Sequence, residues 1–210
     1  IDAIYVAGPN YLHKKDTIDT LEAGKHVILE KPMAMNTAEC EEIIEAAKKS
    51  KKKLMIAHCL RFNDTVAFFK KYVGSGKLGR LLYGTADYCF NVSHSPRKWV
   101  FQKDIAGGGP SFDLAAHTID TLRYISGLRV IESQCWGYPE NRKREEVEHT
   151  AIYMMKFEKE FVGRSIVSFV PEYTTFLEFV GTQGTIRASK WTLIETEVSV
   201  QISEGDKIYS

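Results

Sequence analysis

The sequence predicts an α/β plus α+β chain: the C-terminal half of a doubly wound parallel sheet, followed by a domain with a large, mostly antiparallel sheet and helices on one face. Two observations predict it. Over the first sixty residues, short apolar runs alternate with helical patterns, as in parallel strands joined by right-handed crossovers. Beyond them, strand-like runs follow one another with short turns, which is typical of antiparallel sheets. We therefore divide the chain into residues 1–60 and 61–210.

The first part is expected to hold three strands and two helices. The strands are predicted at residues 2–7, 26–29 and 53–57, and the helices at 11–23 and from 37 into the lysine-rich run 48–53. Gly8-Pro9-Asn10 is typical of a turn that ends in a helix-capping residue. Asn36-Thr37-Ala38-Glu39 has the spacing of a capping box, which starts the second helix.

The second part is expected to hold two longer helices and at least seven strands. The helices are predicted at residues 64–73 and 111–125, separated by an irregular loop at 91–106. The strands are predicted at 80–90, 128–137, 148–157, 161–169, 173–181, 185–188 and 197–203, with a further strand-like run at 207–209 and a solvated loop at 141–148. This sheet has more area than its local helix can cover. We therefore expect its free face to pack against another subunit, in a homodimer or homotetramer.

Composition excludes several classes of function. The chain has 28 basic and 27 acidic residues, so no net field favours nucleic acid or a membrane surface. No apolar run is long enough to span a bilayer, and the four cysteines are dispersed without a CxxC pair, which indicates reduced thiols in a cytoplasmic protein. No HxxxH or HExxH spacing exists, so no metal site is expected. The first residues resemble a strand in mid-fold, which suggests that the chain has lost its beginning.

The tripeptide Glu30-Lys31-Pro32 follows an apolar strand and precedes a capped helix. Open α/β sheets bind their ligands at the carboxyl ends of parallel strands, where this tripeptide lies. A lysine there can stabilise negative charge as a carbonyl and an alkoxide interconvert. Pro32 restricts Lys31 to extended geometry. The alternative is a lysine whose side chain simply extends from a strand end into solvent.

A second set lies in the run Gly107-Gly108-Gly109 to Asp120, where Asp113 and His117 are spaced to share one helix face. Histidine is suited to take and return a hydroxyl proton near neutral pH. The carboxylate can orient the imidazole and favour its charged form. The glycines would let the backbone pass close to a ligand. A capping or core-satisfied Asp/His pair is the alternative.

The E-K-P tripeptide and the GGG…D…H…D run together resemble the Gfo/Idh/MocA family of nicotinamide-dependent sugar and polyol dehydrogenases. The resemblance implies that Lys31, Asp113 and His117 are the catalytic residues, that the cofactor is NAD or NADP, and that the substrate is a sugar, an inositol-like polyol or a related hydroxy compound. The family's GxGxxG half-domain and its C-terminal end are not recognisable here. We therefore expect an inactive fragment in which the choice between NAD and NADP is not readable.

The same resemblance assigns further residues to the cofactor. Residues 7–13 are similar to the family's segment along the nicotinamide pocket, although Gly8 stands where threonine or serine is common. The residues expected to bind the cofactor are Pro9, Asn10, His13, Glu30, Lys31, Arg61 and Trp99. Four of these residues have alternative interpretations. Asn10 could cap a helix and His13 could lie on the surface. Arg61 could form a junction or surface ion pair, and Trp99 could pack in an interface. His94, Lys103 and His149 are weaker candidates for substrate contact.

A non-catalytic binding or regulatory protein on the same scaffold is the main rival function. The presence of the lysine, the aspartate and the histidine together argues against it, whereas the lack of a recognisable nucleotide fingerprint argues for it.

Overall fold

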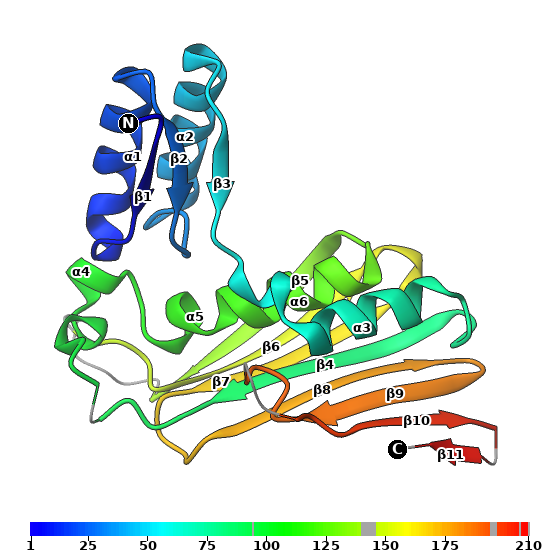
Figure 1. Cartoon of the computed structure of the whole chain (residues 1–210). Helices are drawn as coiled ribbons and strands as arrows, with labels where there is room; N and C mark the ends of the chain where they lie inside the picture. Colours follow the sequence, from blue (N-terminus) through cyan, green and yellow to red (C-terminus); the bar gives the residue numbers. More distant parts are fainter. Residues whose placement is uncertain (94, 140–145, 194–196, 206, 210) are drawn as a thin grey trace.

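A computed structural model describes residues 1–93, 95–139, 146–193, 197–205 and 207–209 of the chain. These residues form a three-stranded sheet and an eight-stranded sheet, joined after β3 (Figure 1). The predicted fold class is confirmed. His94 and residues 141–145 of the expected loop lie outside the described residues.

The small sheet is parallel, in the order β1-β2-β3. Its elements are β1 (Ala3–Val6), β2 (His26–Leu29), β3 (Leu54–Ile56), α1 (His13–Glu22) and α2 (Thr37–Ser50). The two helices cover one face of the sheet, where Leu21 and Ile43 are buried with Val27 and Leu29 in one apolar cluster. On the opposite face Tyr5, Ile28 and Met55 stand in one cross-strand row, 58%, 41% and 44% exposed.

Local capping signals fix the second helix as the sequence predicts. The Asn36 side chain accepts a hydrogen bond from the Glu39 N–H at 3.0 Å, and Glu39 Oε2 accepts one from the Met35 N–H at 3.1 Å. The reciprocal bond thus reaches one residue further back than in the usual capping box. The first helix differs more, because a 3-10 turn η1 (Asn10–Leu12) precedes it and Pro9, not Asn10, stands at the N-cap of that turn.

The large sheet has the order β11-β10-β9-β8-β4-β7-β6-β5. Its strands are β4 (Leu81–Cys89), β5 (Val130–Tyr138), β6 (Thr150–Phe157), β7 (Val162–Ser168), β8 (Thr174–Gly181), β9 (Gly184–Ser189), β10 (Val200–Glu204) and β11 (Lys207–Tyr209). Among the described strand pairs of this sheet, only β4 and β7 run parallel. The sheet is therefore mostly antiparallel.

The helices of this part lie on one face of the large sheet (Figure 1). They are α3 (Asp64–Gly74), α4 (Lys103–Ala106), α5 (Pro110–Asp113) and α6 (Ala115–Ser126), with the 3-10 turns η2 (Cys59–Phe62), η3 (Lys98–Phe101) and η4 (Glu158–Glu160). Phe69 of α3 and Leu122 of α6 are completely buried with Phe161, Phe179 and Trp191. The single helix expected over 111–125 is wrong in one respect, because the chain breaks at Leu114 into α5 and α6.

The other face of the large sheet carries no helix in the described part of the chain (Figure 1). Tyr83, Trp136, Met154 and Val162 are 46%, 38%, 39% and 39% exposed there, and Tyr83 and Val162 are cross-strand neighbours. An apolar face of this kind suits a protein contact. The expected second subunit stays a prediction. No helix among the described residues is long and apolar enough to cross a lipid bilayer.

Candidate active site

Lys31 and Asp113 come together where the two parts of the chain meet. Lys31 lies just beyond β2, and Asp113 is the last residue of α5. The lysine Nζ lies 2.6 Å from Asp113 Oδ1 and 2.8 Å from the Asp113 backbone oxygen. Both side chains are largely enclosed, with 12% and 13% of their surface exposed. The structure therefore joins two of the three predicted catalytic residues directly.

Asp113 also contacts a cation that the sequence interpretation did not assign to the site. The Arg97 guanidinium lies 3.2 Å from Asp113 Oδ2. Burial alone would raise the pKa of Asp113, but the positive charges of Lys31 and Arg97 outweigh burial and lower it. Asp113 is thus a permanent anion between two cations. The family resemblance drew attention to the loop segment of Arg97, Lys98 and Trp99, yet nothing in a linear sequence pairs Arg97 with Asp113.

His117 lies near the start of α6 and is 9% exposed. Its Nδ1 is buried without a hydrogen-bond partner, and its ring centroid lies 6.0 Å from that of Tyr88. Burial and, second to it, the charge of Lys31 lower the pKa of His117 to about 3. As expected, Asp113 favours the charged imidazole, but it raises the pKa by less than these two effects lower it. His117 is neutral at neutral pH.

Of the residues expected along the cofactor pocket, Asn10 joins the two parts of the chain and His13 joins two segments of the first part. Asn10 is buried, and its side-chain amide donates to the Ala106 carbonyl at 2.8 Å. His13 is buried rather than on the surface, with Nδ1 2.7 Å from the Pro32 oxygen and Nε2 2.9 Å from the Gly8 oxygen. This imidazole therefore links the turn after β1 to the segment after β2.

Three further residues of the cofactor set, Pro9, Glu30 and Trp99, lie at the edges of the site. Pro9 is half-buried at the start of η1. Glu30 accepts a short hydrogen bond from the Tyr5 hydroxyl, and this bond raises the pKa of Tyr5 to about 12. Trp99 is half-buried and packs against an apolar cluster in which Val92 and Val100 of its own loop meet residues of α6, β6 and β7.

Arg61 contacts Asp120 of α6. Its Nε and a terminal nitrogen lie 2.8 and 2.5 Å from the two carboxylate oxygens, in a bidentate pair. His58 Nδ1 lies 3.6 Å from Asp120 Oδ2, and burial lowers the pKa of His58 below its ordinary value. This geometry favours the junction alternative for Arg61. The sequence interpretation missed His58, although its place directly after β3 is a ligand position in open sheets.

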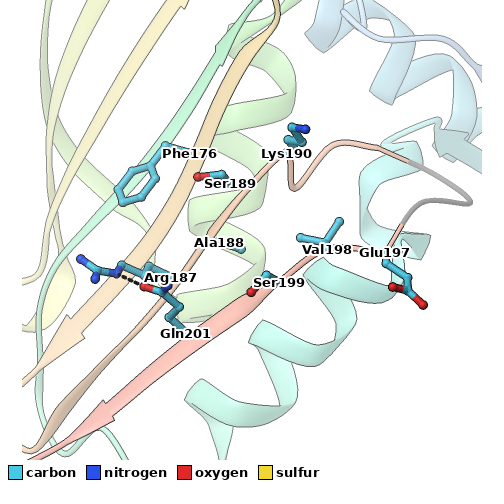
Figure 2. A pocket seen from close by; sticks show the side chains of 9 residues that line it. All are labelled: Phe176, Arg187, Ala188, Ser189, Lys190, Glu197, Val198, Ser199 and Gln201. Atoms are coloured by element: carbon cyan, nitrogen blue, oxygen red, sulfur yellow. Dashed lines mark hydrogen bonds between the residues drawn. The ribbon is translucent and has the colours of Figure 1, made fainter. Parts of the chain in front are cut away.

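Two hollows differ in their relation to these residues. One of about 270 Å³ adjoins the site and is lined by Pro32, His58, Ser111, Phe112, Ala116, Ile119, Asp120 and Arg123. A larger one of about 480 Å³ lies over β8, β9 and β10 (Figure 2), and none of the predicted site residues lines it. In it Arg187 donates to Gln201 at 3.0 Å, so these polar groups satisfy one another. We place the chemistry at the junction, since the charged groups converge there.

No group of three or more histidine, cysteine or acidic side chains in the described part of the chain could hold a metal ion.

A parallel, dinucleotide-type half-sheet joined to a large antiparallel sheet, with polar groups converging at the junction, is the architecture of the NAD-binding, two-domain oxidoreductases. Comparison with known families agrees with this class. Residues 66–187 match the profile described as "GFO/IDH/MocA C-terminal domain", and residues 1–58 match "Oxidoreductase family, NAD-binding Rossmann fold". The chain belongs to the Gfo/Idh/MocA family, and the predicted resemblance and nicotinamide cofactor class are confirmed.

Among curated relatives, levoglucosan dehydrogenase of Pseudarthrobacter phenanthrenivorans is 40% identical over 130 residues, covering 60% of this chain and 33% of that protein. An aldose-aldose oxidoreductase from Caulobacter crescentus, solved with glycerol, covers all of this chain and 62% of its own, with a TM-score of 0.91 and 27% identity. A levoglucosan dehydrogenase solved with NADH and L-sorbose covers 99% and 58%, with a TM-score of 0.83 and 30% identity. The chain thus spans between a third and about three fifths of these relatives.

Proposed function

We propose that this chain is the substrate side of an NAD(P)-dependent oxidoreductase that transfers a hydride between nicotinamide and a CH–OH group of a sugar, an inositol-like polyol or a related hydroxy compound. The observation that carries the proposal is the contact of Lys31 with Asp113, beside a buried, neutral His117. The named sugar substrates of the relatives support the substrate class.

His117 is proposed as the group that takes the hydroxyl proton when the alcohol is oxidised. A neutral imidazole has one nitrogen that can accept a hydrogen bond. Its low pKa keeps that nitrogen unprotonated at neutral pH, and its Nδ1 lacks a protein partner. Tyr88 is a poorer base, because burial raises its pKa to about 12 and keeps the phenol protonated.

Lys31 is proposed to donate a hydrogen bond to the reacting oxygen and to stabilise the negative charge that develops on it. Asp113 holds the ammonium through two oxygens and carries the negative charge that balances it. The side chains around the site fit a nicotinamide: the Lys31 cation lies at the carboxyl end of a parallel strand, and the unpartnered imidazole nitrogen of His117 lies near the start of α6. When bound, the nicotinamide ring supplies the hydride acceptor or donor.

Pro9, Asn10, His13, Glu30, Arg61 and Trp99 are proposed to border the cofactor. Asn10 and His13 would shape the wall of the pocket, since their polar atoms are used within the protein.

The same proposal includes the domain boundary near residue 60. It also includes the incompleteness of both parts and the inactivity of the 210-residue chain. All four cysteines are free, which supports a reducing, cytoplasmic location. A non-catalytic regulatory protein remains the alternative.

The test uses the full-length protein encoded by the complete reading frame. A panel of sugars and cyclic polyols is assayed with NAD⁺ and NADP⁺ by absorbance of the reduced nicotinamide. Lys31→Ala and His117→Ala should each lower kcat by about 10²-fold or more, since each removes a proton-transfer or oxyanion partner. The Kd for the cofactor should barely change. Lys15→Ala, at an exposed position outside the site, is the matched control.

Normal turnover by His117→Ala would remove the histidine from its proposed place. Absence of turnover of every compound by the unmodified protein would favour the regulatory alternative.

A further inference from the structure

Glu148 is a buried carboxylate that has no place in the proposed chemistry. It lies two residues before β6 and is 6% exposed. Its Oε1 accepts hydrogen bonds from the backbone N–H groups of Gly109, at 3.0 Å, and Ser111, at 2.9 Å. Burying a carboxylate is costly unless such donors compensate it. The two N–H groups therefore account for the burial of Glu148.

These N–H groups belong to the start of α5, which lacks an ordinary cap. Gly109 stands at the N-cap position without a side chain, and Pro110, the first helical residue, has no N–H. Glu148 thus supplies from another element the acceptor that a serine or aspartate at position 109 would provide. A Cβ on Gly109 would lie 2.0 Å from the Glu148 backbone oxygen, so glycine is required there.

The other end of α5 is Asp113, which offers two oxygens to the Lys31 ammonium. Only Phe112 separates Ser111 from Asp113 in this single turn, so a displacement at its start moves both oxygens. The glycine segment before α5 is held as well, because Asn10 donates to the Ala106 carbonyl. The turn that carries Asp113 is therefore fixed from the small sheet by Asn10 and from the large sheet by Glu148.

We propose that Glu148 is a positioning residue for Lys31: it caps α5 and thereby sets where Asp113 presents its oxygens to the ammonium. The inference rests on the proposed function of Lys31 and adds a residue that acts through Asp113. A misplacement of about 1 Å caused far from the reacting atoms can cost about 10²-fold in rate. A rate effect of about 10-fold or more is therefore expected from the loss of this cap.

Two substitutions in the full-length protein separate capping from charge. Glu148→Gln keeps an oxygen at the same reach and removes the charge, whereas Glu148→Asp keeps the charge on a side chain one methylene shorter. If Glu148 acts as a cap, Glu148→Asp and Glu148→Ala should lower kcat by about 10-fold or more. The kcat of Glu148→Gln should stay within about threefold of that of the unmodified protein. The KM for the cofactor should be unchanged in all three variants. Glu158→Ala is the control, because Glu158 also accepts from a backbone N–H, that of Arg129 at 3.1 Å, outside the site.

Hydrogen exchange gives a second readout that needs no turnover. The amides of Gly109 and Ser111 should be protected in the unmodified protein and in Glu148→Gln, and should exchange about 10-fold faster or more in Glu148→Asp. The proposal would be overturned if Glu148→Asp had a higher kcat than Glu148→Gln. It would also be overturned if Glu148→Asp left kcat, or the exchange protection of the Gly109 and Ser111 amides, unchanged. If Glu148→Ala does not fold, the Gln and Asp variants still decide. Lack of turnover by the unmodified protein would instead count against the proposed function, while exchange still reports on the cap.

Discussion

Replacing His117 by glutamine should make the stability of the full-length protein less sensitive to acid. In the native state the pKa of His117 is lowered from 6.5 to about 3, mainly by burial. Between these values the unfolded chain binds a proton that the folded chain does not, so stability rises with pH through this window and is lost as pH falls. At pH 5 the difference is about 1.5 pKa units, and at 1.36 kcal/mol per unit this amounts to about 2 kcal/mol.

The assay is urea unfolding followed by circular dichroism at pH 7.5 and pH 5.0. On going to pH 5.0, the unmodified protein should lose about 2 kcal/mol more of its free energy of unfolding than His117→Gln. His149→Gln, which replaces an exposed histidine, should behave like the unmodified protein. Equal losses for the unmodified protein and His117→Gln, within about 0.5 kcal/mol, would refute the claim that His117 is buried in its neutral form.

Two other outcomes follow from the open surfaces. A second copy of the chain should cover the helix-free face of the large sheet, so the full-length protein should sediment as a dimer or tetramer at micromolar concentration. Met154→Asp, on that face, should shift the protein toward the monomer. A monomeric unmodified protein would contradict this expectation. The 210-residue chain should show no detectable NADH or NADPH binding in calorimetric titration. The pyrophosphate usually binds where a glycine turn leads into a helix N-terminus, and this GxGxxG turn is not recognisable in the sequence. Tight binding of either dinucleotide would mean that the cofactor site is misplaced.

The features that the sequence predicted well depend on neighbours along the chain. The α2 start is an example, since the Asn36 side chain caps an N–H only three residues away. The position of Lys31 at a strand end depends likewise on the apolar run before it. Strand number and mostly antiparallel pairing also followed from local patterns. Such signals are readable because their partners lie within one turn or one hairpin.

The features that were missed depend on distant partners. Asp113 and His117 were expected to act on each other because they are four residues apart, but the break at Leu114 leaves Asp113 directed at Lys31, 82 positions away. Burial then determines the protonation of His117, and burial depends on the packing of α6 against the large sheet. The pairing of Arg61 with Asp120, 59 positions apart, is equally unreadable from local pattern.

The second oxygen that holds Lys31 belongs to the main chain. Substitution can remove the Asp113 carboxylate, but it cannot remove the carbonyl that lies 2.8 Å from the ammonium. A variant library at position 113 therefore keeps one of the two lysine anchors in every member, as long as α5 keeps its path. Position 113 is thus a better place than position 31 to vary the chemistry of the proposed site, because the backbone carbonyl still binds the lysine ammonium.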